Sequence, residues 1–372
     1  MRKLPAPTRQ IAAVPAVTPF VAPEELARRV GRTSLLRLGA NESAFGPSPR
    51  ALAAMRDALD HISWYGDPQS LELREALAAR HGCAPENVVI GSGIDDVMSL
   101  VVRTFCAPGD VALATLGTYP TWGFHVAGFG AVLETVDPTP AAAIDVDALI
   151  LGAAATAPKI VYVANPDNPS GTFVGAVELA RLRAGLADDV LLVIDEAYAD
   201  FVPPATLLPD VLDPRTLRLR TFSKAYGLAG ARVGYALASA ETIATINKIR
   251  QHFGVNRGAQ IGALAALGDP AFVAGVVNEI ARGREDYAAL GRRLGCRTLP
   301  SVTNFVCFEI GSRAAAEAMV HTLLERGVFV RKPSAPPIDG CIRVTVGTAA
   351  ERAAFAQIFS EALASAREKA AV

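Results

Sequence analysis

The sequence predicts an α/β protein, with a doubly wound, mostly parallel sheet in a large domain and a smaller α+β domain beside it. Apolar runs of strand length alternate with helix-compatible stretches through the middle of the chain. These runs are unbroken stretches rich in Val, Ile and Leu, which is typical of strands covered by helices on both faces. The last three runs end near residues 163, 194 and 220, about one βαβ unit apart.

The order of elements follows from these runs. In the large domain we expect strands and intervening helices, with the strands at 87–90, 111–115, 160–163, 190–194 and 217–219 and helices at 97–105 and 176–186. Past residue 260 we expect long helices and short strands, at 271–294 and 314–326 and at 304–309, 327–330 and 341–346. The predicted large domain comprises residues 41–260, and the small domain combines residues 1–40 with 261–372.

The composition indicates a globular protein and excludes several classes. The chain has 372 residues, of which 51% are hydrophobic and 20% charged, so a large core is available and disorder is excluded. Its 36 basic and 37 acidic residues give a net charge of -1. We therefore expect no nucleic-acid partner held by bulk charge.

Cysteine usage and apolar stretches bear on the compartment. The five cysteines are an odd number, are widely spaced and contain no C-x-x-C pair, which favours free thiols over disulfides or a metal site. Pro15 interrupts the apolar stretch near the N-terminus, so it lacks the pattern of a signal peptide. We also find no 18-residue apolar stretch of membrane-helix character, and we expect a cytoplasmic protein without a membrane partner.

Polar residues follow three consecutive predicted strands. Asn165 opens the segment NPDNPSG, Asp195 and Tyr198 follow the next strand, and Lys224 follows the third in the segment TFSK. Taken singly, these residues are typical of a turn, a helix cap and a solvated lysine. Because ligands bind at the carboxyl ends of parallel strands, their occurrence in order predicts a ligand site at this edge.

A glycine pair supports a phosphate-bearing ligand. Gly91 and Gly93 follow a predicted strand and open a helix, where backbone N–H groups and the helix dipole favour an anion. Asp96 stands where a dinucleotide fingerprint has its third glycine, which argues against an NAD-dependent dehydrogenase. A phosphate cradle with Lys, Asp and Tyr fits pyridoxal phosphate (PLP), which needs a lysine for covalent attachment and an acid at its ring nitrogen.

Five motifs together resemble the class II aminotransferases of PLP fold type I, and among them the histidinol-phosphate aminotransferase family. They are GSGIDDV, NPDNPSG, IDEAYADF, TFSKAYGLAGARVGY and IRVTVGT, and the resemblance runs from LGANESAFGPSP to residues 346–348. It implies a PLP-dependent transaminase that exchanges an amino group between an amino donor and a 2-oxo acid, 2-oxoglutarate, in histidine biosynthesis. It also implies a homodimer with shared active sites.

The resemblance assigns roles to particular residues. Lys224 would be the catalytic residue that binds PLP and moves the substrate proton, and Asp195 would pair with the ring nitrogen. The other cofactor-binding residues that it implies are Gly93, Ile94, Asp95, Tyr119, Asn168, Tyr198, Thr221, Ser223 and Arg232, with Tyr65 from the partner subunit. No metal site is implied.

The implied substrate-binding residues leave the substrate open. Arg343 matches the family's arginine for an anionic group, Arg331 resembles a second anion contact, and Asn41 lies in a substrate-side loop. Phe20 stands where the family typically has a tyrosine whose hydroxyl can reach a phosphate. An aromatic amino acid aminotransferase is therefore an alternative.

Other PLP-binding classes are weighed against the transaminase. A PLP-dependent decarboxylase of a phosphorylated amino acid would share the fold and the lysine. A PLP-binding transcription regulator would need a DNA-binding domain before Asn41, where we expect no room for one.

Overall fold

The computed structural model describes residues 5–15, 20–209 and 212–371. Its centre is a seven-stranded sheet with the strand order β2-β8-β7-β6-β5-β3-β4. In chain order these strands are β2 (Val88–Gly91), β3 (Val111–Thr115), β4 (Val132–Val136), β5 (Ile160–Ala164), β6 (Leu191–Asp195), β7 (Thr216–Thr221) and β8 (Gly234–Leu237). β4, β3, β5, β6 and β7 are parallel, whereas β8 is antiparallel to both of its neighbours. The predicted doubly wound, mostly parallel sheet is confirmed.

Two strands of this sheet were not predicted. β4 lies at the edge of the sheet, and its first four residues are exposed, so it lacks the continuous apolar run of a buried strand. β8 has the sequence GYAL, and glycine and alanine are poor indicators of a strand. Gly234 is needed here because a Cβ at this position would lie 2.8 Å from the backbone nitrogen of Ile94.

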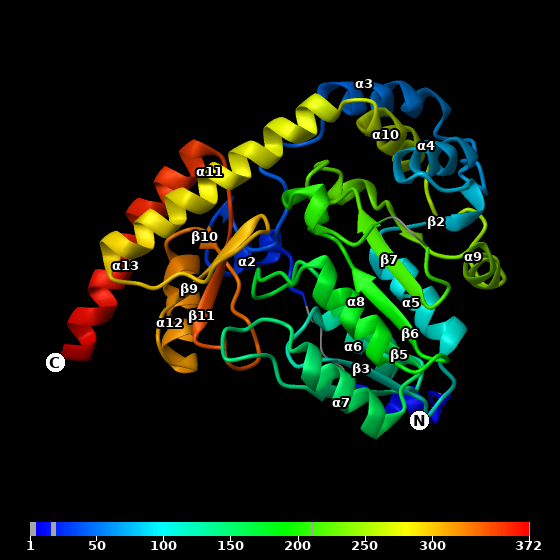
Figure 1. The fold of residues 1–372 in the computed structure, drawn as a ribbon. Helices are drawn as coiled ribbons and strands as arrows, with labels where there is room; N and C mark the ends of the chain where they lie inside the picture. Colours follow the sequence, from blue (N-terminus) through cyan, green and yellow to red (C-terminus); the bar gives the residue numbers. More distant parts are fainter. Residues whose placement is uncertain (1–4, 16–19, 210–211, 372) are drawn as a thin grey trace.

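Helices cover both faces of the sheet (Figure 1). On one face lie α5 (Ile94–Phe105), α6 (Pro120–Gly128) and α9 (Ala240–Asn247), which bury residues such as Val101, Trp122 and Ile243 against the strands. On the other face lie α7 (Val146–Thr156) and α8 (Ala176–Gly185), which bury Leu149 and Leu182. The predicted helices at 97–105 and 176–186 are confirmed, with α5 beginning three residues earlier.

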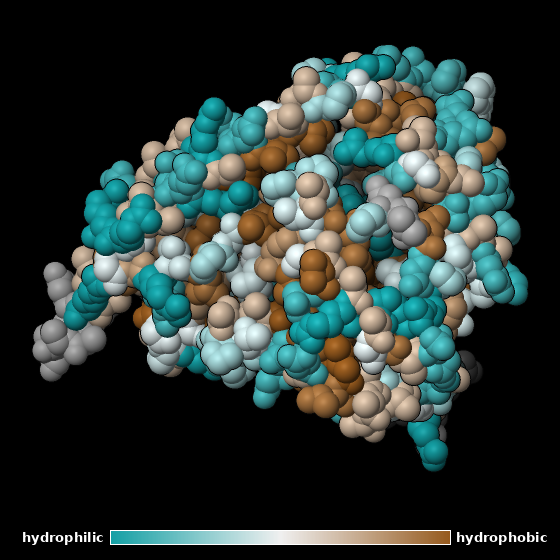
Figure 2. Space-filling view, in the orientation of Figure 1, coloured by the Kyte–Doolittle hydropathy of each residue, from teal (hydrophilic) through white to brown (hydrophobic). Residues whose placement is uncertain are grey.

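The C-terminal part packs on a long helix. α11 (Pro270–Leu294) runs across the top of the molecule in Figure 1 toward α12 (Arg313–Glu325) and α13 (Ala349–Ala371). Its buried residues, among them Ile280 and Tyr287, recur at helical spacing, whereas the surface along it carries many hydrophilic residues (Figure 2). β9 (Phe305–Glu309) and β11 (Cys341–Thr345) form an antiparallel pair beneath these helices.

The N-terminal segment contacts both parts of the molecule. β1 (Leu36–Arg37) pairs in parallel with β10 (Val328–Phe329), while α1 (Arg9–Ala13) lies against α6. The remaining elements are α2 (Pro23–Arg29), α3 (Pro49–Ala58), α4 (Leu71–His81), α10 (Arg257–Leu267) and the short helices η1 (Leu59–His61), η2 (Pro85–Asn87), η3 (Ala199–Phe201), η4 (Pro204–Thr206) and η5 (Ala229–Ala231). The division of the chain at residues 40 and 260 stays a prediction.

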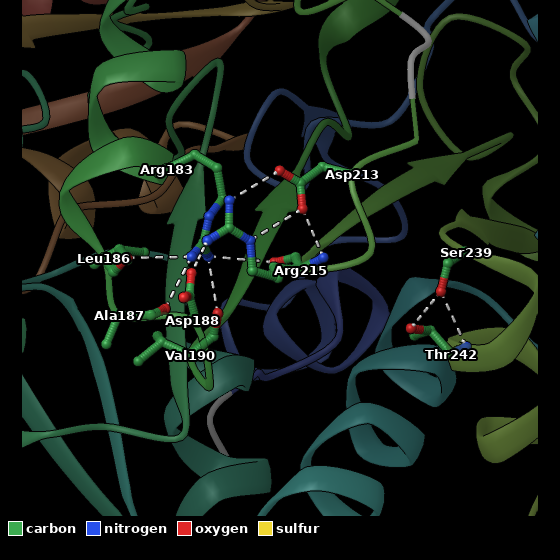
Figure 3. A network of polar contacts seen from close by, with 9 residues as sticks. All are labelled: Arg183, Leu186, Ala187, Asp188, Val190, Asp213, Arg215, Ser239 and Thr242. Atoms are coloured by element: carbon green, nitrogen blue, oxygen red, sulfur yellow. Dashed lines mark hydrogen bonds and ion pairs between the residues drawn. The ribbon is translucent and has the colours of Figure 1, made fainter.

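The amino ends of β6 and β7 are tied together by two arginines (Figure 3). The buried Arg183 on α8 donates from Nη1 to the carbonyl of Val190 at 2.8 Å and from Nη2 to that of Ala187 at 2.9 Å. Arg215 pairs with Asp188 and with Asp213. These bonds fix the end of α8 to the start of the next strands.

Two general properties of the described residues complete the fold. None of the five cysteines forms a disulfide among the described residues. Within 5–15, 20–209 and 212–371, no single helix is long and apolar enough to cross a membrane. The pair α10 and α11 together reaches that length and composition but is bent by 82°.

Candidate active site

A cavity of about 240 Å³ lies at the carboxyl ends of β5, β6 and β7, beside the start of α5. This is the edge at which the sequence predicts a ligand site. Most of the predicted cofactor-binding residues line it, namely Ile94, Asp95, Tyr119, Asn168, Asp195, Tyr198, Thr221, Ser223, Lys224 and Arg232. Residues from five segments far apart in the sequence therefore meet around one space.

Lys224 follows β7 and lies among the residues that wall the cavity. Its Nζ lies 5.7 Å from the centre of the Tyr198 ring. Burial, reinforced by the positive charge of Arg343, lowers the pKa of the Lys224 ammonium group to about 8. A substantial fraction of this amine is therefore neutral near physiological pH, as nucleophilic or proton-transfer chemistry requires.

Asp195 ends β6 and is buried. Its Oδ1 accepts a hydrogen bond from the backbone N–H of Ala197 at 3.0 Å, and its Oδ2 accepts one from the Tyr162 hydroxyl at 2.7 Å. Burial raises the pKa of Asp195 to about 6, while these two hydrogen bonds and Lys224 act in the opposite direction. A carboxylate in this position can balance a positive charge in the cavity.

The start of α5 and the segment after β7 carry groups that can bind an anion. Gly93 precedes α5 with a φ of +83°, and a Cβ there would overlap Nη2 of Arg232. Arg232 Nη2 lies 3.8 Å from Asp95, and the Thr221 hydroxyl accepts the backbone N–H of Ser223 at 3.0 Å. Helix N–H groups, hydroxyls and a guanidinium group are the donors that bind phosphate in proteins.

Aromatic and amide side chains close the other sides. Tyr119, directly before α6, donates its hydroxyl to Asp95 at 3.1 Å. The Tyr198 hydroxyl accepts a hydrogen bond from Asn41 at 2.9 Å. Burial raises the pKa values of both tyrosines, so both hydroxyls stay protonated at neutral pH.

Arginines from the C-terminal part reach the same region. Arg343 on β11 donates to Asn168 Oδ1 at 2.5 Å and to the Gly39 carbonyl at 2.9 Å, and its buried Nε has no partner among the described residues. The guanidinium carbon Cζ of Arg331 lies 5.3 Å from the centre of the Phe20 ring and 5.1 Å from the centre of the Phe329 ring. Phe20 is 46% exposed and contacts this arginine rather than lining the cavity.

Similarity to known proteins shows the family to which this chain belongs. A family model described as aminotransferase class I and II matches residues 33–359. The chain belongs to the class I and II aminotransferases. It is 38% identical over 362 residues to histidinol-phosphate aminotransferase of Sphingopyxis alaskensis, covering 94% of this chain and 96% of that protein. The corresponding enzyme of Roseiflexus castenholzii is 36% identical over 360 residues, with the same coverage.

A solved structure extends the similarity to three dimensions. Histidinol-phosphate aminotransferase from Sinorhizobium meliloti, in complex with pyridoxal-5'-phosphate, matches with a TM-score of 0.94 and 38% identity. The match covers 98% of this chain and 99% of that one. This aminotransferase is therefore a PLP-dependent enzyme of fold type I in the histidinol-phosphate aminotransferase family, acting on an amino donor and a 2-oxo acid. The predicted family, activity and cofactor are confirmed.

The residues of the aminotransferase fit PLP. The cofactor needs an amine for covalent attachment, a carboxylate for its ring nitrogen and donors for its phosphate. Lys224, Asp195 and the residues around Arg232 carry these chemical groups and line one cavity. A Cβ at Gly93 would lie 2.2 Å from Nη2 of Arg232. Because glycine has no side chain, the backbone before α5 can lie beside this guanidinium group.

Among the predicted cofactor-binding residues, Tyr65 lies away from the cavity of its own chain. Tyr65 is 76% exposed, and its ring packs on that of Phe253 at 4.5 Å. It belongs to a group of large exposed hydrophobic side chains, which we call the apolar patch, formed by Leu59, Ile62, Trp64, Tyr65 and Phe253.

Tyr162 was not predicted as a site residue. It lies in β5, is fully buried, and donates to Asp195. A hydroxyl in an otherwise apolar strand, IVYVA, must find a partner, and this was the available signal. The sequence does not show which acceptor it would meet.

Proposed function

We propose that this aminotransferase transfers the amino group of histidinol phosphate to 2-oxoglutarate. The observation that carries the proposal is the near full-length similarity to proteins of that name, at 38% identity and a TM-score of 0.94. The two arginines beside the cavity are consistent with an anionic substrate, since guanidinium groups bind phosphates and carboxylates in bidentate fashion. The odd number of widely spaced cysteines supports a cytoplasmic location.

Lys224 is the proposed catalytic residue. Bound PLP supplies an electron sink for the carbon that loses its proton. The Lys224 amine, whose pKa is lowered to about 8, is the group that would take up this proton and release it again. The buried carboxylate of Asp195, which two protein donors orient, would balance the positive charge on the ring nitrogen.

The other cofactor contacts divide between phosphate and ring. In the proposal, the start of α5, with Gly93, Ile94 and Asp95, binds the phosphate together with Thr221, Ser223 and Arg232. Tyr119 stacks on the ring, and Asn168 and Tyr198 contact its hydroxyl. These assignments are supported by the position of all these residues on or beside one cavity wall.

Arg343, Arg331 and Asn41 are the proposed substrate-binding group. Arg343 is half-buried beside Asn168, and its buried Nε–H has no partner among the described residues, so a substrate oxygen would satisfy it. Asn41 orients Tyr198 at the cavity wall.

The proposed active unit is a homodimer. The apolar patch is supported as its interface because five large exposed hydrophobic side chains gather around Tyr65. A second copy that covers this patch would bring Tyr65 to the neighbouring cavity. Mixing Lys224→Ala with Tyr65→Ala subunits should restore activity in heterodimers that contain one intact site, and no recovery despite subunit exchange would contradict shared sites.

An aromatic amino acid aminotransferase is the second candidate. It is favoured by Phe20, which has no hydroxyl to donate to a phosphate and which packs on Arg331. The test is the kcat/KM for histidinol phosphate, phenylalanine and tyrosine with 2-oxoglutarate as acceptor. The first proposal expects histidinol phosphate to be preferred by at least tenfold, and a preference for phenylalanine or tyrosine would replace it with the second.

A further inference from the structure

Behind Asp195 lies a pair of stacked aromatic side chains that the cofactor site does not include. Trp122 on α6 and Tyr162 on β5 are both fully buried, with ring centres 4.5 Å apart and an interplanar angle of 9°. The Tyr162 hydroxyl donates to Asp195 Oδ2 at 2.7 Å. Close packing against Trp122 and within β5 fixes the Tyr162 ring, and the hydroxyl of this fixed ring meets Asp195 as its acceptor.

We propose that Tyr162 is a positioning residue for the aminotransferase reaction: its hydroxyl, held by the Trp122 ring, keeps the Asp195 carboxylate ionised and facing the cavity. The proposal rests on the proposed pairing of Asp195 with the ring nitrogen of PLP. A buried carboxylate loses hydration, and hydrogen bonds to its charged form are the main compensation. Asp195 has two such donors, and Tyr162 is the only side-chain donor to it among the described residues.

The stack also connects this donor to the cavity wall. α6 begins directly after Tyr119, which lines the cavity, and Trp122 follows within its first turn. The start of α6 therefore places both Tyr119, whose ring lines the cavity, and Trp122, whose ring stacks on Tyr162. Burial raises the pKa of Tyr162 well above its ordinary value, so the hydroxyl remains a donor throughout the pH range of catalysis.

The other charged groups around Asp195 are few. Lys224 faces it from the segment after β7 and favours its ionised form, whereas Asp95 on α5 opposes it. Asp167, after β5, has a pKa raised to about 6 by burial, and Ser170 donates to its Oδ2 from both its backbone N–H and its hydroxyl. Its titration provides an internal reference.

The experiment uses the full-length protein with aspartate labelled by carbon-13 at the carboxyl carbon. The signals of Asp195 and Asp167 are identified by their loss in Asp195→Asn and Asp167→Asn. In Tyr162→Phe the Asp195 titration should move upward by about one to two pH units, while that of Asp167 stays in place. Tyr287→Phe is the matched control, because Tyr287 is equally buried and donates at 3.1 Å to the Thr345 carbonyl in the small-domain core.

A second variant should shift the Asp195 titration in the opposite direction. Fluorotyrosine at position 162 is a more acidic donor of nearly the same size, so the Asp195 titration should move downward. In the PLP-loaded enzyme, the acidic limb of the kcat profile should move upward in Tyr162→Phe, with the KM for the amino donor little changed. A purely structural hydroxyl would not produce opposite shifts from the two substitutions.

Two results would overturn different statements. An Asp195 titration unmoved by either change at Tyr162 would refute the positioning role. If Asp195→Asn leaves the absorption spectrum and dissociation constant of bound PLP unchanged, the pairing of Asp195 with the cofactor fails instead.

Discussion

The two ends of the parallel strands use buried charge in different ways. At the amino ends of β6 and β7, Arg183 directs its terminal nitrogens to backbone carbonyls, and Arg215 pairs with Asp188 and Asp213 (Figure 3). At the carboxyl ends, Lys224 and Asp195 surround a cavity and have pKa values displaced toward neutrality.

This difference separates stabilising from reactive charge. Backbone carbonyls fix Arg183, so its guanidinium group holds the chain together and has little left to offer a ligand. Asp195 is buried and Lys224 is half-buried at the cavity, and loss of hydration displaces the pKa of each toward neutrality. Groups with displaced pKa values gather at functional sites. Substitutions at the two ends should therefore affect different measurements.

The largest expected effect is at Lys224. Lys224→Ala removes both the attachment point of PLP and the proposed proton carrier, so kcat/KM should fall by at least about 10⁴-fold. Borohydride reduction followed by mass spectrometry should find the cofactor on Lys224 in the parent enzyme and on no lysine in the variant.

Lys159 offers the matched control at the other end of the strands. It immediately precedes β5, is exposed and lies 3.7 Å from Asp189. Lys159→Ala should retain parental activity and covalent PLP. Unaltered turnover in Lys224→Ala would end the assignment of this end as the reactive one.

The second effect is at Asp195. Asp195→Asn preserves shape but removes the negative charge, so transamination should fall by roughly 10²–10³-fold, as when a preorganised electrostatic partner is lost. The measurement is single-turnover kinetics, with circular dichroism to show that the fold survives. Rates near those of the parent would mean that Asp195 only caps the strand end.

These residues show how far sequence reasoning reaches. Asp195 and Lys224 could be predicted because each ends an apolar run, and topology alone brings such ends together. Tyr162 and Arg183 could not, since their roles depend on acceptors that only tertiary packing supplies. Arg183 lies in the segment RLR of a helix, which is typical of a solvated face.

The same limit applies to the less regular parts of the chain. β8 was missed because a Gly- and Ala-containing strand has little hydrophobic signal, and its close approach to α5 is a tertiary requirement. The contact of Phe20 with Arg331 joins residues 311 positions apart through loops whose course no periodicity predicts. The position of Tyr65 relative to a neighbouring site depends on a second chain.

The third prediction concerns Arg183, where we expect a loss of stability without a loss of activity. Arg183→Ala removes the guanidinium donor from the buried carbonyls of Leu186 and Val190, so the free energy of unfolding should fall by about 3 kcal/mol while kcat/KM stays unchanged. Arg181→Ala, two residues earlier on α8, removes exposed ion pairs with Asp147 and Glu178 and should cost less than about 1 kcal/mol. Urea unfolding of the PLP-free proteins measures both, and equal losses would contradict the structural role of Arg183.

The smallest expected effect is a pH dependence at Lys224 itself. In the PLP-free protein its amine, with a pKa of about 8, should react with an acylating reagent at a rate that rises about tenfold per pH unit up to pH 8 and then levels off. In denaturant the same lysine should level off only near its ordinary pKa of 10.5. Because the folded pKa is the lower one, the unfolded chain binds more protons between pH 8 and 10.5, so this group makes the free energy of unfolding rise with pH across that window. Lys224→Met should lack this rise, whereas identical pH dependence in both proteins would show that burial does not displace the titration of Lys224.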